Sequence, residues 1–379
     1  MITKSEGVTP TERLLADLCE RSFLKFWSYP NPYKEDGDEL CDLLAVFENH
    51  VFVFFDRECH VLDEGEKDVV VSWKRWKKKV IDKQVSSAHG AERYIRSGRG
   101  IFLDAAKQTP FPVSFDAESV TVHKIIVAHG AKEACLRSST DNVYGSLAIS
   151  YGQEYEGFQI PFLIRIDKNA PVHVLDSHNL PIVLGELDTF SDLVLYLEAK
   201  TAAIEKFDWL TYCGEENLLA HYFFNFDENK QAHFIGTKQS NGNGITIGEG
   251  EWRDFVASPA YKRKKQADKV SYLWDELVQR TCQEALDGTL MGNSGFVKGG
   301  RNGAVYVMAK EPRFVRRALS EAMINAVRDF PDTPHSLTTN ITLMPSYYEG
   351  TAYVFLQVNI DGMTEPDVGP IRRGCVSDS

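Results

Sequence analysis

The chain has 379 residues, of which 43% are hydrophobic and 11% aromatic, and its formal net charge is −12. This composition is typical of a globular protein with core material for about two domains, and no apolar run reaches the ~18 residues of a membrane span. An acidic protein repels a polyanion at long range, so the overall charge gives no indication of nucleic-acid binding.

The seven cysteines are scattered along the chain, and no two of them form a Cys-x-x-Cys pair. This spacing fits reduced thiols and argues against a zinc ribbon or a disulfide framework. The first residues show no charged-then-apolar signal pattern. We therefore expect a cytoplasmic protein without a membrane partner.

Residues 9–29 are predicted to form a helix. Thr9 suits the cap position, and leucine and aromatic side chains then recur at helical spacing until Pro30 ends the helix. Glu20 lies within this segment. It can be interpreted either as an ordinary surface acid or as a functional one.

Residues 38–60 form the most informative stretch of the chain. The apolar runs 40–47 and 51–55 are predicted to be two buried strands of a hairpin, joined by a polar turn. Asp56 and Glu58 share a face of the second strand because alternate strand residues point the same way. Asp42 begins the first strand and should lie beside them.

Three carboxylates at the edge of a core repel one another unless a cation lies among them. A hard divalent ion such as Mg2+ takes carboxylate oxygens as ligands. The alternative interpretation is that Asp42, Asp56 and Glu58 are ordinary polar residues at strand ends. The spacing alone does not choose between the two.

A long helix is predicted over residues 70–97. Trp73 and Trp76 lie on its apolar face and are interpreted as core residues. Gln84 falls on the same side with Lys83 beside it, an arrangement that requires hydrogen-bond partners unless Lys83 extends to solvent. The helix also carries a basic run that suits either phosphate binding or a solvated surface: Lys74, Arg75, Lys77, Lys78 and Lys79.

The rest of the chain reads as alternating strands and helices with two Gly-rich loops. His123, His129, His173 and His178 lie on or beside strands and are interpreted as structural rather than metal-binding. A domain boundary is predicted near residue 210. Further strands are expected at 120–128, 146–151, 161–166, 172–175, 304–309, 337–344 and 352–360, and further helices at 189–205, 216–226, 251–257, 265–287 and 312–330.

The order of these features resembles the PD-(D/E)XK nuclease superfamily, which includes many restriction enzymes. The resemblance covers residues 10–130: a helix with Glu20, a strand with Asp42, a strand that ends in Asp56-Arg57-Glu58, and a basic helix. It implies a mixed α/β, restriction-endonuclease-like core over residues 1–210. Residues 211–379 would then form a smaller α+β domain for regulation, dimerisation or binding.

The resemblance implies a metal-dependent nuclease that acts on DNA, with RNA as the alternative substrate, in bacterial defence. Asp42 and Asp56 would bind Mg2+ or Mn2+, Glu58 would bind a second ion or orient the attacking water, and Glu20 would complete the metal site. Lys83 and Gln84 would hold the scissile phosphate or its water. The basic run would contact backbone phosphates, and a second copy or a defence-system protein would be the protein partner.

The chain departs from the family pattern at Glu58, where the family has a lysine. Some restriction enzymes carry glutamate there and remain active. The rival hypothesis is a non-catalytic protein that keeps the fold and binds nucleic acid or a partner. Other hydrolase classes are disfavoured because the sequence has no Gly-x-Ser-x-Gly or His-Glu-x-x-His motif.

Overall fold

The computed structural model describes residues 4–62, 68–138, 144–152, 160–237, 244–287, 303–330 and 339–359. The chain divides into two compact units, residues 2–261 and residues 262–379. Both contain helices and strands, so the fold is mixed α+β. None of the helices in the described ranges has the length and apolar character needed to span a membrane.

The first unit is built on a five-stranded sheet in the order β1-β3-β4-β6-β9. Strands β1, β3 and β4 are antiparallel neighbours, whereas β4, β6 and β9 run parallel. The bounds are β1 Ser28–Pro30, β3 Leu43–Phe47, β4 His50–Glu58, β6 Thr121–His129 and β9 His173–Asp176. The predicted hairpin is confirmed, with Phe47 opposite His50 at its turn.

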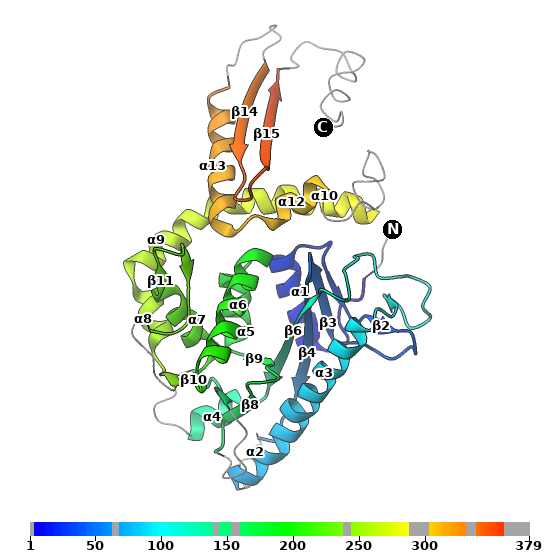
Figure 1. Ribbon diagram of the computed structural model, residues 1–379, viewed down its shortest axis with the longest axis vertical. Coiled ribbons are helices and arrows are strands. Elements are labelled where there is room, and N and C mark those ends of the chain that lie inside the picture. The colour runs from blue at the N-terminus through cyan, green and yellow to red at the C-terminus, as the bar shows by residue number, and fades with distance from the viewer. Residues whose placement is uncertain are drawn as a thin grey trace. The chain divides into compact units, whose positions relative to one another are not determined.

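Both faces of this sheet are covered, which explains why β4 is almost continuously apolar. On one face Val51, Val53 and Phe55 pack against α3 Lys83–Arg96, which crosses β4 and β6 in Figure 1. On the other face Phe52 stacks on Phe23 of α1 Pro10–Phe23, with ring centroids 5.4 Å apart. Even-numbered residues of β4, including Asp56, therefore belong to the α1 face.

The helix predicted over residues 70–97 is confirmed, but it contains an irregular segment. Helix α2 Val69–Lys77 continues into a π-helical segment, Lys78–Asp82, and then into α3. Segments of this kind are frequent at functional sites. The helix α1 is shorter than predicted, because β1 begins at Ser28.

A second sheet of the first unit has the order β13-β10-β7-β8. Strand β10 Trp209–Cys213 pairs with β7 Ala148–Gly152 and β13 Gly244–Ile247, and β7 pairs with β8 Leu163–Asp167. The predicted boundary near residue 210 is therefore wrong, because that segment is an inner strand. The remaining elements of this unit are β2 Tyr33–Lys34, β5 Ile101–Phe102, α4 Lys132–Ser138, α5 Asn179–Glu186, α6 Phe190–Lys206, α7 Glu215–Phe224, β11 Phe226–Asp227, β12 Ala232–His233 and α8 Glu251–Ala257.

The second unit begins within α9 Pro259–Asp268. It contains a short 3-10 turn Lys269–Ser271, α10 Tyr272–Asp287, α12 Ala304–Lys310, α13 Arg313–Arg328 and the hairpin β14 Thr339–Pro345 with β15 Ala352–Val358. The predicted strand at 304–309 is wrong, because this segment is α12. A short apolar run does not distinguish a strand from a buried helix, and here the run packs on α10. The Gly-rich loop at 292–303 lies outside the described residues except for Gly303.

Candidate functional site

Polar side chains gather where the parallel strands β4, β6 and β9 end. Asp56 lies near the carboxyl end of β4, His129 is the last residue of β6, and Ser177 directly follows β9. The register places Glu58 of β4 beside His129 of β6. The carboxyl ends of parallel strands are the usual position of binding sites in open α/β sheets.

Asp42 reaches this edge from the antiparallel side of β4. It directly precedes β3, and its backbone N–H donates to the carbonyl oxygen of Phe54 over 3.1 Å. The backbone N–H of Asp56 in turn donates to Oδ2 of Asp42 over 2.5 Å. The hairpin geometry predicted this approach of Asp42 to Asp56.

The carboxylate of Asp56 is buried and bonded at both oxygens. Oδ1 accepts a hydrogen bond from the Thr11 hydroxyl over 2.5 Å, and Oδ2 lies 2.9 Å from Nε2 of His129. Thr11 is in the first turn of α1, where the helix dipole favours a negative charge. Helix α1 and strand β6 therefore fix the orientation of this carboxylate.

Two further acids are linked to Asp42 by Asn31, whose backbone N–H donates to the carbonyl oxygen of Asp42 over 2.9 Å. Nδ2 of Asn31 donates to Oε1 of Glu39 over 2.6 Å and to Oε2 of Glu12 over 3.2 Å. Burial raises the pKa of Asp42 to about 7, and the negative charges of Glu39, Glu12 and Asp56 act in the same direction. Burial also raises the pKa of Glu39. We call Glu12, Glu39, Asp42 and Asp56 the acidic cluster.

No protein-family model, curated protein or solved structure matches the chain.

Two of the acids predicted for the site lie apart from the acidic cluster. Glu20 is in the last turn of α1, roughly 13 Å along the helix axis from Thr11, and pairs with Lys25 at 3.5 Å. Glu58 is exposed at the end of β4, with its carboxylate 3.6 Å from Nε2 of His60. The glutamate that α1 contributes near Asp42 is therefore Glu12 rather than Glu20.

Lys83 and Gln84, the residues predicted to hold the phosphate, are not hydrogen-bonded to Asp42 or Asp56 in the described part of the chain. Gln84 is buried in the first turn of α3 and Lys83 beside it is exposed. Trp73 and Trp76 are fully buried, so their interpretation as core residues is confirmed.

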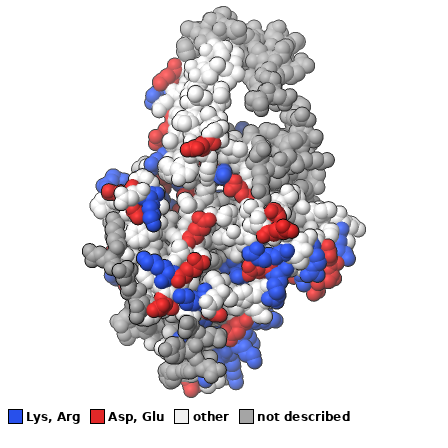
Figure 2. All heavy atoms as spheres, viewed as in Figure 1, with Lys and Arg blue, Asp and Glu red and all other residues white. Residues whose placement is uncertain are grey.

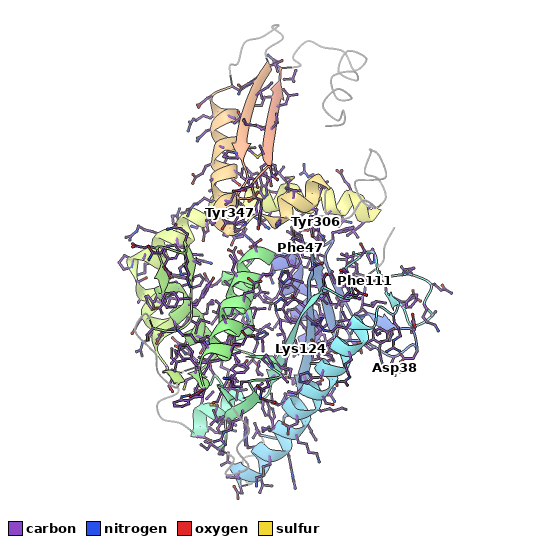
Figure 3. All side chains as sticks on the ribbon, in the orientation of Figure 1. Asp38, Phe47, Phe111, Lys124, Tyr306 and Tyr347 are labelled. Carbon is purple, nitrogen blue, oxygen red and sulfur yellow. The ribbon has the colours of Figure 1, made fainter. Side chains whose placement is uncertain are left out.

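The basic run is largely exposed to solvent. Lys77 pairs with Asp82 at 2.5 Å, whereas Lys74, Arg75, Lys78 and Lys79 are exposed on α2 and the π-helical segment. In the view of Figure 2 basic side chains lie over the α2 end, and both signs are mixed elsewhere. Lys124, labelled in Figure 3, lies near the start of β6 and pairs with Glu92 of α3 at 2.5 Å. It therefore does not substitute for the lysine that the family pattern has at the position of Glu58.

Within the described ranges, no three His, Cys, Asp or Glu side chains form a group with the geometry of a metal site. Of the predicted metal ligands, Asp42 and Asp56 are joined by a hydrogen bond, from the Asp56 backbone N–H to the Asp42 carboxylate. His123 lies 3.0 Å from His50 between ring nitrogens, which agrees with a structural role for that histidine.

The sequence interpretation missed Glu12, Glu39, Thr11 and His129. Glu12 stands three residues after Thr9, and this capping-box spacing explains the start of α1 without a further role. Glu39 stands three residues before Asp42 in a polar loop. Only the parallel pairing of β4 with β6 brings His129 to Asp56, and no local pattern reveals that pairing.

Proposed function

We propose that this protein is a metal-dependent phosphodiesterase that cleaves DNA, with RNA as the alternative substrate. The observation that carries the proposal is the direct bond from Asp56 to the Asp42 carboxylate at the carboxyl edge of the sheet. Glu12 and Glu39 add negative charge to the same place. Burial, with the charges of the neighbouring acids acting in the same direction, raises the pKa of Asp42 to about 7, and a bound cation would offset the cost of its charge.

The order of elements supports the same proposal. Apart from the separate β2–β5 pair, and with α2, the π-helical segment and α3 counted as one helix, the chain runs α1, β1, β3, β4, helix, β6, which is an α-β-β-β-α-β order. Asp42 precedes the second of these strands and Asp56 lies near the end of the third. This is the arrangement that the resemblance to restriction-endonuclease-like nucleases implies.

The acidic cluster suits Mg2+ or Mn2+ better than a softer metal, because its donors are carboxylate oxygens. Mg2+ is usually bound by one or two carboxylates, several waters and the phosphates of the substrate. Asp42 and Asp56 would hold it, with Glu12 or Glu39 as a further ligand. The ion would lower the pKa of a bound water and offset charge on the phosphate.

The exposed lysines and Arg75 on α2 and the π-helical segment would bind the phosphate backbone. Local positive charge of this kind is needed because the net charge of −12 opposes the approach of a nucleic acid. We assign this role to four side chains: Lys74, Arg75, Lys78 and Lys79.

A non-catalytic nucleic-acid-binding or partner-binding protein is the second candidate. Two observations favour it. Glu58 occupies the position at which the nuclease family has a lysine, and its carboxylate is exposed beside His60. A protein of this kind would keep its binding activity when Asp42 or Asp56 is neutralised.

The test is cleavage of plasmid DNA and of single-stranded RNA in Mg2+, in Mn2+ and in EDTA. We expect metal-dependent cleavage by the wild type, its loss in D42N and D56N, and full activity in the matched control E20Q. Both asparagine variants keep the side-chain shape, and the amide oxygen introduced by D42N can still accept the Asp56 N–H. Cleavage that persists in D56N, or in EDTA, would contradict the proposal.

A further inference from the structure

A chain of hydrogen bonds runs from the surface to Asp56 through His129. The Ser177 Oγ lies 2.8 Å from Nδ1 of His129, and Nε2 of His129 lies 2.9 Å from Oδ2 of Asp56. Ser177 is exposed, whereas His129 and Asp56 are 4% and 5% exposed. The backbone of His129 is fixed as well, because Nε1 of Trp76 donates to its carbonyl oxygen over 3.0 Å.

The partners of His129 determine which of its ring nitrogens carries the proton. An ionised carboxylate only accepts hydrogen bonds, so Nε2 must donate to Asp56. In the neutral imidazole Nδ1 is then an acceptor, and the Ser177 hydroxyl donates to it. A serine side chain can act in this way because its hydroxyl hydrogen rotates freely.

We propose that His129 is a positioning residue for Asp56, and that the hydrogen bond to Ser177 fixes the orientation of its ring. The proposal rests on the proposed nuclease function. An ionised carboxylate has about four lone-pair sites. Thr11 and His129 occupy one on each oxygen and so leave the remaining sites oriented for a cation. Partners of this kind typically change metal affinity or activity roughly 10- to 100-fold.

The experiment compares H129L, H129Q and S177A with the control H123L. Leucine removes the donor at position 129, while the amide of glutamine can place a donor where Nε2 lies. His123 is a buried histidine of the same strand and the same face, so H123L reports the general cost of removing an imidazole. Three quantities are measured: the tautomer of His129 by 15N NMR, the affinity for Mn2+, and kcat and KM for cleavage.

We expect the Nε2–H tautomer in the wild type and also in S177A, because the Asp56 carboxylate can only accept a hydrogen bond from Nε2. Mn2+ affinity and kcat should fall roughly 10- to 100-fold in H129L and recover substantially in H129Q. They should fall roughly 2- to 10-fold in S177A, the range for one hydrogen bond. KM for the nucleic acid should change little, because His129 is buried behind Asp56.

Equal Mn2+ affinity and kcat in H129L and H123L would overturn the positioning role, and the loss of both properties in D56N would show that the nuclease site itself stands. An Nδ1–H tautomer in the wild type would overturn the hydrogen bond from His129 to Asp56, and unchanged Mn2+ affinity and kcat in S177A would overturn the role of Ser177. A wild type that neither binds Mn2+ nor cleaves nucleic acid would remove the proposed function, and the role of His129 with it.

Discussion

The backbone N–H of Asp56 donates a hydrogen bond of 2.5 Å to the carboxylate of Asp42. This bond lies at the open end of the β3–β4 hairpin, so the two acids stay together as long as the hairpin is paired. Asp42 cannot move away from Asp56 without losing this bond. Folding therefore holds the Asp42 carboxylate in a buried position where its negative charge destabilises the folded state.

The first prediction concerns the pH dependence of stability. The pKa of Asp42 is raised from 3.8 to about 7 in the folded state, so between these values the native state holds a proton that the unfolded state has released. The free energy of unfolding contributed by this group is fully present below pH 3.8 and is lost as the pH rises toward about 7. D42N should remove this part of the decline.

Urea unfolding of the wild type and D42N from about pH 4 to about pH 8 measures the effect. The control is D17N, which neutralises an exposed acid of α1. A decline in D42N as steep as in the wild type would show that Asp42 titrates normally in the folded protein.

The second prediction separates the glutamates of α1. E12Q and E39Q should reduce metal-dependent cleavage roughly 10- to 100-fold, because both acids accept hydrogen bonds from the Asn31 side chain, whose backbone N–H donates to the carbonyl oxygen of Asp42. E20Q should have no effect, since Glu20 pairs with Lys25 in the last turn of the helix. Initial rates at saturating Mg2+ make the comparison, and activity lost in E20Q but kept in E12Q would refute this composition of the site.

The third prediction concerns the two stacked tryptophans of α2, whose ring centroids are 5.0 Å apart. The Nε1 of Trp76 donates to the carbonyl oxygen of His129, whereas the buried Nε1 of Trp73 has no hydrogen-bond partner among the described residues. W76F should therefore lower the free energy of unfolding by roughly 1–3 kcal/mol more than W73F, because it leaves a buried carbonyl unpaired. Urea unfolding measures both variants, and an equal loss would mean that the bond contributes nothing.

The sequence predicted the parts of the site that depend on local geometry. The apolar runs on either side of a polar turn predicted the hairpin, and antiparallel pairing then predicted that Asp42 lies beside Asp56. His129 could not be predicted in the same way, because its approach depends on the parallel pairing of β4 with β6 across the intervening helix. Thr11 could not be predicted for a related reason, because its hydrogen bond to Asp56 depends on how α1 packs on the sheet.

The errors have physical causes too. Glu12 stands three residues after Thr9, where a glutamate is explained by helix capping alone, so its sequence position gives no sign of a role beside Asp42. The boundary predicted near residue 210 falls on β10, where Leu210 and Tyr212 are fully buried and Trp209 is exposed. One short strand between two helices carries too little periodicity to be recognised.

The fourth prediction concerns the basic surface. K78Q/K79Q removes two exposed lysines of the π-helical segment and should weaken nucleic-acid binding. It should also flatten the slope of log affinity against log salt by about 1 for each lost phosphate contact. K262Q/R263Q on α9 removes the same charge elsewhere. Equal effects of the two double variants would show that only net charge matters.

The fifth prediction contrasts two neighbouring buried glutamates at the start of α7. Both oxygens of Glu215 lie 2.7 Å from Nζ of Lys200, and the hydroxyls of Tyr196 and Tyr212 each donate to it over 2.6 Å. Glu216 accepts a hydrogen bond from Ser146 at Oε1, but within the described part of the chain its Oε2 has no hydrogen-bond partner. Burial raises the pKa of Glu216 to about 8, with the charge of Asp176 acting in the same direction.

E215Q should lower the free energy of unfolding at neutral pH by about 3–5 kcal/mol, because it leaves the fully buried Lys200 without its counter-charge. E216Q should raise it or leave it unchanged. The raised pKa means that wild-type stability falls as the pH increases from 4.5 toward about 8, and glutamine removes that decline. Urea unfolding at neutral pH measures both variants. A loss in E216Q as large as in E215Q would mean that Glu216 is held as a satisfied charge, contrary to its unbonded oxygen.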